Sequence, residues 1–149
     1  MLINGIVVSG HGVASGYTGD PRFPGGTLAL QLPIFRQLGL DLEGLHLGTL
    51  NVSVAPFLPQ PQRALSTFRD IMWHPDCPAE DFSFFDMRIA TTEGEPVPAY
   101  IYWPHPETKP EHFHDPHVVE ILAPRLEDIA EGVPVRLWID PGRMKFQDE

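Results

Sequence analysis

Proline and glycine interrupt this chain so often that no long regular element fits between them. Seventeen prolines and 13 glycines are spread over the 149 residues, and no apolar segment keeps one period for long. Because these two residues are the strongest interrupters of regular structure, the pattern favours short strands joined by turns over a helix bundle. Strands are predicted at 2–9, 48–54, 84–91, 98–103, 117–122 and 133–139.

Helical spacing is confined to two short segments. Between Thr27 and Leu38, leucines and Phe35 recur every three or four residues, with Thr27 as the N-cap, although Pro33 is expected to kink or shorten the helix. A second helix is predicted at 125–130, where Gly132 would follow as a stop. The length suits one domain, predicted to span 1–140, with a loosely held tail at 141–149.

The charge and cysteine content restrict the possible partners and compartment. Ten Lys and Arg against 20 Asp and Glu give a formal net charge of −10, which argues against nucleic-acid binding. No apolar run approaches the roughly 20 residues of a membrane-spanning helix, and no export signal is evident, so no membrane partner is expected. The single cysteine, Cys77, fits a reducing environment, and a cytoplasmic protein is predicted.

The run from Gly48 to Val52 places two oxygen-bearing side chains two positions apart on a predicted strand. Side chains alternate across a strand, so Thr49 and Asn51 face one side while Leu50 and Val52 enter the core. A hydroxyl and an amide oxygen are hard ligands that suit Mg²⁺. Taken alone, the run is also compatible with an ordinary half-buried strand that has a polar face.

Two further segments carry chemistry near the chain ends. Near the N-terminus, an apolar strand leads into Gly10, Gly12 and Gly16, whose backbone N–H groups can form a concave anion site. Near the C-terminus, Glu120 is a lone carboxylate within the apolar strand Val118 to Leu122. Such a carboxylate is suited to act as a base or as a hydrogen-bond acceptor.

Together, in this order, the three segments resemble the CTP-dependent riboflavin kinases of the archaeal type. That family opens with a strand and glycine loop of the form Val-Val-Ser-Gly-x-Gly, continues to Gly-Thr-Leu-Asn and closes with Glu-Ile-x-Ala-Pro. The matching segments here are Val7 to Gly12, Gly48 to Asn51 and Glu120 to Pro124. The resemblance implies a mainly β fold, a compact six-stranded cradle-loop β-barrel with one or two short helices.

The resemblance also implies an activity, the transfer of the γ-phosphoryl group of CTP to riboflavin to give FMN. Thr49 and Asn51 would bind Mg²⁺, and Glu120 would act as the catalytic residue that accepts or orients the acceptor hydroxyl. His112 and His114 would border the riboflavin or related flavin. The nucleotide phosphates would be held by a group in the glycine loop, namely Gly10, His11, Gly12 and Gly16.

Departures from the family pattern leave two alternatives open. The chain lacks the glutamate usual after the second glycine of the loop, has an insertion at 17–26 and aligns poorly over 56–98. One alternative is therefore a non-catalytic flavin- or nucleotide-binding module. The other is a metal-dependent β-barrel enzyme, in which histidines of the 105–117 segment and Glu120 would bind a transition metal. These histidines are His105, His112, His114 and His117.

Overall fold

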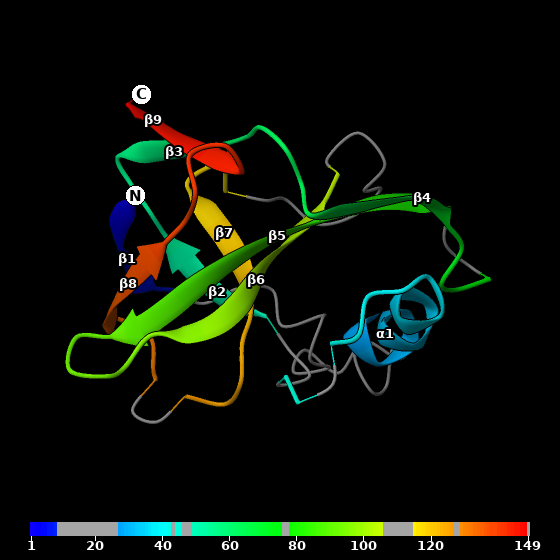
Figure 1. Cartoon of the computed structure of the whole chain (residues 1–149), viewed down its shortest axis with the longest axis horizontal. Coiled ribbons are helices and arrows are strands. Elements are labelled where there is room, and N and C mark those ends of the chain that lie inside the picture. The colour runs from blue at the N-terminus through cyan, green and yellow to red at the C-terminus, as the bar shows by residue number, and fades with distance from the viewer. Residues whose placement is uncertain are drawn as a thin grey trace.

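The computed structural model describes residues 1–8, 27–42, 44–45, 49–75, 78–105, 115–126 and 129–148. The chain is mainly β, with one short helix among the described residues (Figure 1). In chain order the elements are β1 (Leu2–Val7), α1 (Thr27–Gln37), β2 (Leu50–Ser53), β3 (Phe57–Pro61), β4 (Ser66–Ile71), β5 (Glu80–Thr91), β6 (Val97–Pro104), β7 (Val118–Leu122), β8 (Pro134–Trp138) and β9 (Met144–Asp148).

Six antiparallel strands close into a barrel. The hydrogen-bonded order is β5-β6-β7-β2-β1-β8, and β8 pairs back onto β5. In the closed ring each of the six strands pairs with a neighbour on both sides. The ring therefore has no free edge to which a strand of another chain could add. The six strands correspond to the six predicted from the sequence, so the expected six-stranded barrel with a short helix is confirmed.

The barrel interior is filled by the alternate side chains of its strands. The side chains that point inward and are buried include Ile3 and Val7 of β1, Val52 of β2, and Val119 and Ile121 of β7. The period of two in these strands is the signal that the sequence carries for a half-buried sheet. Gly5 lies between Ile3 and Val7 on the same inward face, close to the Val52 side chain of β2.

Strand β5 is longer than the barrel needs, and its first half extends away from it. Its C-terminal half pairs with β8, whereas its N-terminal half pairs with β4 and with the end of β6. The three strands form an arm that reaches beyond the barrel and lies over α1 (Figure 1). A β-bulge between Phe68 and Ile71 interrupts β4, with Asp70 in the left-handed region at φ 55°.

A second hydrophobic cluster lies between this arm and α1. Phe35 of α1 is fully buried, and its ring contacts Phe82 and Phe84 of β5 edge-on, with centroids 5.2 and 4.9 Å away. The helix continues past Pro33 and ends at Gln37. Gly39 follows with a φ of 103°, which lets the Leu40 N–H donate a hydrogen bond to the Phe35 carbonyl over 3.0 Å. Within the described ranges, no helix is long and apolar enough to span a membrane.

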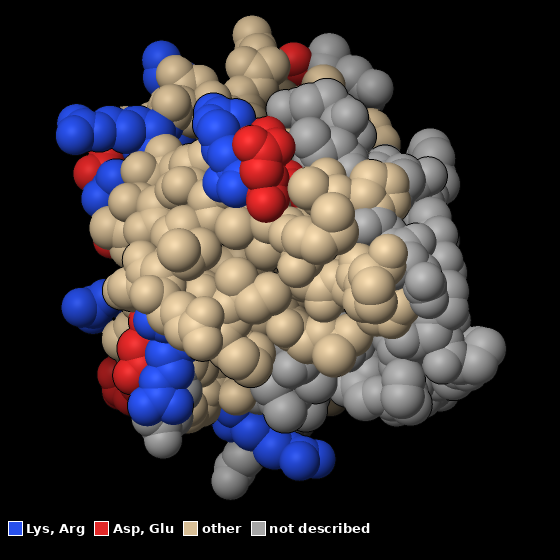
Figure 2. Space-filling model, turned by 90° about the vertical axis from the view of Figure 1, so that its right-hand side faces the viewer, with Lys and Arg blue, Asp and Glu red and all other residues tan. Residues whose placement is uncertain are grey.

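The end of the molecule formed by α1 and the tip of β4 has an uncharged middle. Figure 2 views this end directly. Apart from one adjacent basic and acidic group near its upper part, uncharged side chains cover the middle of the face.

The predicted loosely held tail at 141–149 is wrong for residues 144–148. Met144–Asp148 forms β9, which pairs antiparallel with β3 from Phe57↔Asp148 to Pro61↔Met144. Met144 is fully buried and joins the barrel core. The apolar contacts of Met144 and of Phe146, which packs against the same core, and the pairing with β3 hold the segment in place.

The second predicted helix, at 125–130, is not observed in the residues that can be assessed. Residues 125, 126, 129 and 130 are described and carry no helix. Leu126 and Ile129 instead pack against the barrel core as part of the connection from β7 to β8. Tertiary packing therefore outweighs the weak helical spacing of this short segment.

Candidate functional site

A row of polar side chains crosses three neighbouring strands of the barrel. Asn51 of β2 lies opposite Glu120 of β7, and Glu120 lies opposite Tyr102 of β6. Residues directly opposite in antiparallel strands share a face. Because the neighbouring Val52 and Val119 point into the barrel, the row faces outward, on the side of the sheet that α1 covers.

Thr49 and Glu120 are in direct contact on this outer face. The Thr49 hydroxyl donates a hydrogen bond to Glu120 Oε1 over 3.2 Å. Glu120 Oε2 is buried and has no hydrogen-bond partner within the described part of the chain. A buried carboxylate oxygen without a donor is unfavourable by about 1–3 kcal/mol or more, so this atom is a natural acceptor for a ligand hydroxyl or N–H group, or for a cation.

The two predicted magnesium ligands and the predicted catalytic carboxylate thus form one cluster. Thr49, Asn51 and Glu120 come from segments about 70 residues apart, and the β2–β7 register brings them together. Their oxygen-bearing groups are one hydroxyl, one amide and one carboxylate. This donor set fits Mg²⁺, which prefers hard oxygen ligands and retains several positions for water or phosphate.

Val8, the last described residue before the glycine-rich segment, is bonded to the backbone of Asn51. The Val8 N–H donates to the Asn51 carbonyl over 2.9 Å, immediately before the chain enters residues 9–26. Gly10, His11, Gly12 and Gly16, predicted to hold the nucleotide phosphates, lie outside the described residues. The predicted flavin-bordering residues His112 and His114 also lie outside them.

Tyr102 and Gln31 join the site to helix α1, and sequence reasoning did not identify this connection. The Tyr102 hydroxyl donates to Gln31 Oε1 over 2.5 Å, and both side chains are buried. Gln31 is a polar residue on the inward face of α1, where helical periodicity predicts an apolar side chain. A buried glutamine that interrupts an apolar helical face was the available signal, because such an amide needs a partner.

Two carboxylates flank the Tyr102 ring. Glu120 lies opposite Tyr102 on β7, whereas Glu80 of β5 is buried and accepts a hydrogen bond from the Trp73 indole N–H over 2.7 Å. Burial raises the pKa of Tyr102 well above its ordinary value, and the negative charges of Glu120 and Glu80 raise this pKa further. The hydrogen bond with Gln31 opposes the shift. Tyr102 therefore stays a neutral donor at physiological pH.

The raised pKa of Tyr102 predicts a loss of stability in alkali. Above about pH 10 the tyrosine ionises in the unfolded chain but keeps its proton in the folded one. The free energy of unfolding therefore falls as the pH rises past this value, by up to about 1.4 kcal/mol per pH unit from this group. Urea titrations between about pH 8 and 11 are expected to show a shallower decline for Tyr102→Phe than for the wild type. Parallel declines in the two proteins would contradict the assignment.

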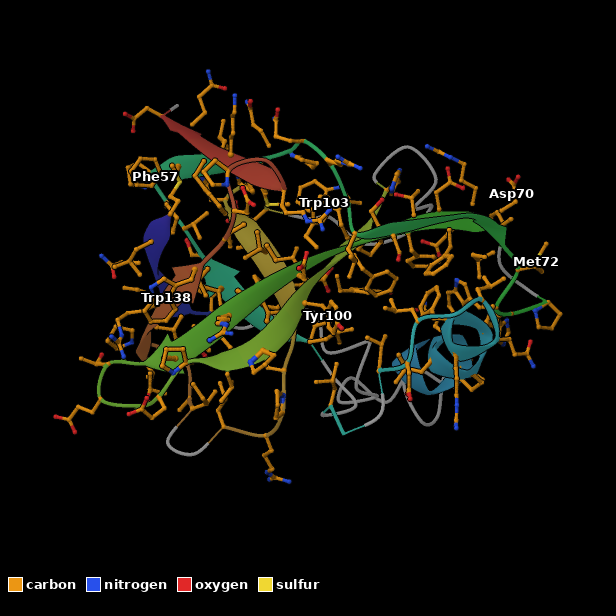
Figure 3. All side chains as sticks on the ribbon, viewed as in Figure 1. Phe57, Asp70, Met72, Tyr100, Trp103 and Trp138 are labelled. Carbon is orange, nitrogen blue, oxygen red and sulfur yellow. The ribbon has the colours of Figure 1, made fainter. Side chains whose placement is uncertain are left out.

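The aromatic residues of β6 separate onto its two sides. Tyr100 lies on the side of α1 and Trp103 on the opposite side (Figure 3), as strand alternation predicts. Tyr102 belongs to the face of Tyr100, and its ring stacks with Phe82 at a centroid distance of 5.7 Å. Aromatic side chains, Tyr100 and Phe82 among them, therefore lie on the same face as Tyr102, and aromatic faces suit a flat ligand.

The histidines that the structure describes have partners other than a metal. His105 Nε2 lies 2.6 Å from Ser83 Oγ, and His117 Nδ1 lies 2.9 Å from the Phe57 carbonyl oxygen. Among the described residues, no three His, Cys, Asp or Glu side chains gather closely enough to hold a metal ion. In the sequence, His105 precedes and His117 follows residues 106–114, whose own histidines lie outside the described residues.

Comparison of this chain with family models, curated proteins and solved structures found no match. What supports a function is the chemistry of the residues on the outer face of β2, β7 and β6.

Proposed function

We propose that this protein is a magnesium-dependent phosphotransferase that moves the γ-phosphoryl group of CTP to riboflavin and forms FMN. The observation that carries the proposal is the buried Glu120 Oε2, which has no partner among the described residues and lies beside Thr49 and Asn51. The three residues belong to two of the segments that carry the resemblance to CTP-dependent riboflavin kinases, with Thr49 and Asn51 in one and Glu120 in the other. Their meeting on one face supports a common site.

Thr49 and Asn51 are the proposed metal ligands. The Thr49 hydroxyl donates a hydrogen bond to Glu120, so a lone pair on its oxygen can point toward a cation. Asn51 is half-buried and lies opposite Glu120, where its amide oxygen has access to the same side of the sheet. Bound Mg²⁺ would neutralise charge on the nucleotide phosphates.

Backbone amides are the proposed holders of the phosphates themselves. A chain of net charge −10 with Glu120 and Glu80 near the site needs a phosphate-binding element that does not rely on a basic surface. The glycine-rich segment follows Val8 in the sequence. The Val8 N–H donates a hydrogen bond to the backbone carbonyl of Asn51, one of the proposed metal ligands. Backbone N–H groups of Gly10, His11, Gly12 and Gly16 would serve this purpose.

Glu120 is the proposed base for the acceptor. Its Oε2 would accept the proton of the riboflavin 5′-hydroxyl, whose oxygen then forms a bond to the γ-phosphorus as the bond to the β-phosphate oxygen breaks. CDP would leave, and FMN would remain. Catalysis of this kind depends mostly on positioning and charge neutralisation. His112 and His114 would border the flavin.

The metal assignment predicts a loss of magnesium-dependent nucleotide binding in Asn51→Leu. Removing the amide oxygen is expected to weaken binding of CTP with Mg²⁺ by about tenfold, because one ligand of the cation is lost. Isothermal titration calorimetry with and without Mg²⁺ measures this change. The fold should persist, because the Asn51 side chain is only half-buried.

Asn4→Leu is the matched control for this change. Asn4 lies on the exposed outer face of β1, opposite Arg136 and away from the cluster. The control is expected to bind CTP and Mg²⁺ as the wild type does. If Asn51→Leu also keeps wild-type affinity, then Asn51 is not a metal ligand.

A further inference from the structure

The amide of Gln31 has one group that the fold does not use. Its Oε1 accepts the hydrogen bond from the Tyr102 hydroxyl over 2.5 Å, and Gln31 makes no other hydrogen bond within the described part of the chain. The two branches of an amide diverge, so Nε2 points away from Tyr102 with two N–H donors that have no acceptor. Because an unsatisfied amide inside a protein is costly, this nitrogen is a natural donor to a ligand.

The Gln31 nitrogen can be reached from outside, although the residue as a whole is only 2% exposed. In the described ranges, the fully buried side-chain atoms that lack a hydrogen-bond partner are Glu120 Oε2 and Arg136 Nε. Gln31 Nε2 also lacks a partner but is not one of these atoms, so the small exposed part of the residue includes it. A donor that is reachable and unpartnered on an otherwise buried side chain suits ligand binding.

The orientation of this amide is fixed from both ends. The Tyr102 ring is buried and contacts Phe82 and Phe84, with centroids 5.7 and 5.9 Å away. On the helix, Phe35 lies four positions after Gln31, and its ring packs against the same two phenylalanines. The backbone and the oxygen branch of Gln31 are therefore held, and binding through the nitrogen branch costs little further ordering.

The unused donor of Gln31 and the unused acceptor of Glu120 lie on the same side of the sheet. Glu120 is opposite Tyr102 in the β6–β7 register, and Gln31 bonds to the far end of the Tyr102 side chain. A ligand that reaches both atoms needs a hydroxyl at one end and a hydrogen-bond acceptor at the other. Riboflavin has this arrangement, because its ribityl chain separates the 5′-hydroxyl from the ring carbonyls.

We propose that Gln31 determines specificity for the flavin ring, with its Nε2 donating a hydrogen bond to the ring carbonyl oxygen at C2 or C4. Tyr102 is a positioning residue, because its hydroxyl holds the amide with Nε2 turned toward the ligand. The inference rests on the proposed function, since it takes riboflavin as the acceptor with its 5′-hydroxyl at Glu120. Tyr100 and Phe82, which share this face, offer the ring aromatic contacts.

Equilibrium dialysis with riboflavin, 2-thioriboflavin and 4-thioriboflavin tests the contact, in the absence of nucleotide so that no phosphoryl transfer is needed. Sulfur accepts hydrogen bonds weakly, so the wild type is expected to bind one of the two thio analogues about fivefold more weakly than riboflavin. Gln31→Met keeps the length of the side chain and removes the amide. This variant is expected to bind riboflavin about fivefold more weakly than the wild type and to lose the preference for oxygen over sulfur.

Gln37→Met is the matched control, because Gln37 is an exposed glutamine at the last position of the same helix. This variant should keep both the riboflavin affinity and the oxygen preference of the wild type. Tyr102→Phe lets the amide of Gln31 turn, so it is expected to reduce the oxygen preference. A general loss of packing would instead weaken riboflavin and both thio analogues by the same factor.

The outcomes against the proposal are read from binding alone. A wild type that binds no flavin, or that binds riboflavin and both thio analogues equally, overturns it without any variant. An oxygen preference that persists in Gln31→Met, or a loss in that variant that falls only on CTP, overturns it as well. If no FMN forms while the oxygen preference depends on Gln31, the phosphotransferase assignment is wrong and the flavin contact stands.

Discussion

Glu120→Gln is expected to lower the rate of riboflavin phosphorylation by about 100-fold or more while riboflavin binding is kept. The amide preserves the size of the side chain and can still accept the hydrogen bond from Thr49, but it cannot take up the proton of the acceptor hydroxyl. The effect should therefore fall on the rate of the chemical step rather than on the affinity. FMN formation followed by chromatography gives the rate, and fluorescence titration of riboflavin gives the affinity.

Asp86→Asn is the control for Glu120→Gln. Asp86 is an exposed carboxylate on the barrel strand β5 that pairs with Arg143 over 2.9 Å, and it is not a member of the polar row. Its loss of charge should leave both the rate and the affinity near wild type, because exposed ion pairs contribute little. An equal loss of binding and rate in Glu120→Gln would make Glu120 a recognition residue rather than a base.

Gly5→Val is expected to destabilise the barrel by about 3 kcal/mol, a large fraction of the stability of a small domain. A Cβ atom at Gly5 would lie 2.4 Å from Val52 Cγ1 and 3.1 Å from the Ser53 carbonyl oxygen. Val52 is fully buried and cannot turn outward. The added side chain therefore forces β1 and β2, which are neighbours in the barrel wall, apart. Urea denaturation measures the loss.

A neighbouring position and a compensating substitution separate this clash from a general effect. Asn4→Val changes an exposed position of the same strand and should alter the free energy of unfolding by less than about 0.5 kcal/mol. Gly5→Ala combined with Val52→Ala removes the clashing Cγ1 atom. The double variant should then be more stable than the two single changes predict by addition. Strict additivity would show that Val52 is not the obstacle at Gly5.

The barrel strands were predictable because their alternation is local in the sequence. Ile3, Val7 and Val52 lie at positions where an apolar pattern of period two predicts an inward side chain. In the structure all three belong to the buried core. β3 carries Pro59 and Pro61, which argue against a strand because proline donates no ladder hydrogen bond. Its partner β9 lies more than 80 residues further along the chain, and a single sequence gives no sign of that pairing.

The candidate site was predictable in part for a similar reason. The alternation of Thr49 with Leu50 and Asn51 indicates a polar face, and an isolated glutamate in an apolar strand indicates a buried carboxylate that needs a partner. The β2–β7 register that joins them is a long-range property of the fold. The contact of Gln31 with Tyr102 required the position of α1 on the arm, which helical periodicity cannot supply.

The most direct test is whether the unmodified protein forms FMN. Riboflavin is incubated with Mg²⁺ and with CTP, ATP or GTP in separate reactions, and the products are separated by chromatography. The proposed function predicts FMN and CDP in equal amounts in the CTP reaction, with both abolished when the metal is chelated. If no nucleotide yields FMN while riboflavin or CTP still binds, the protein is a binding module on this barrel and the phosphotransferase assignment is wrong.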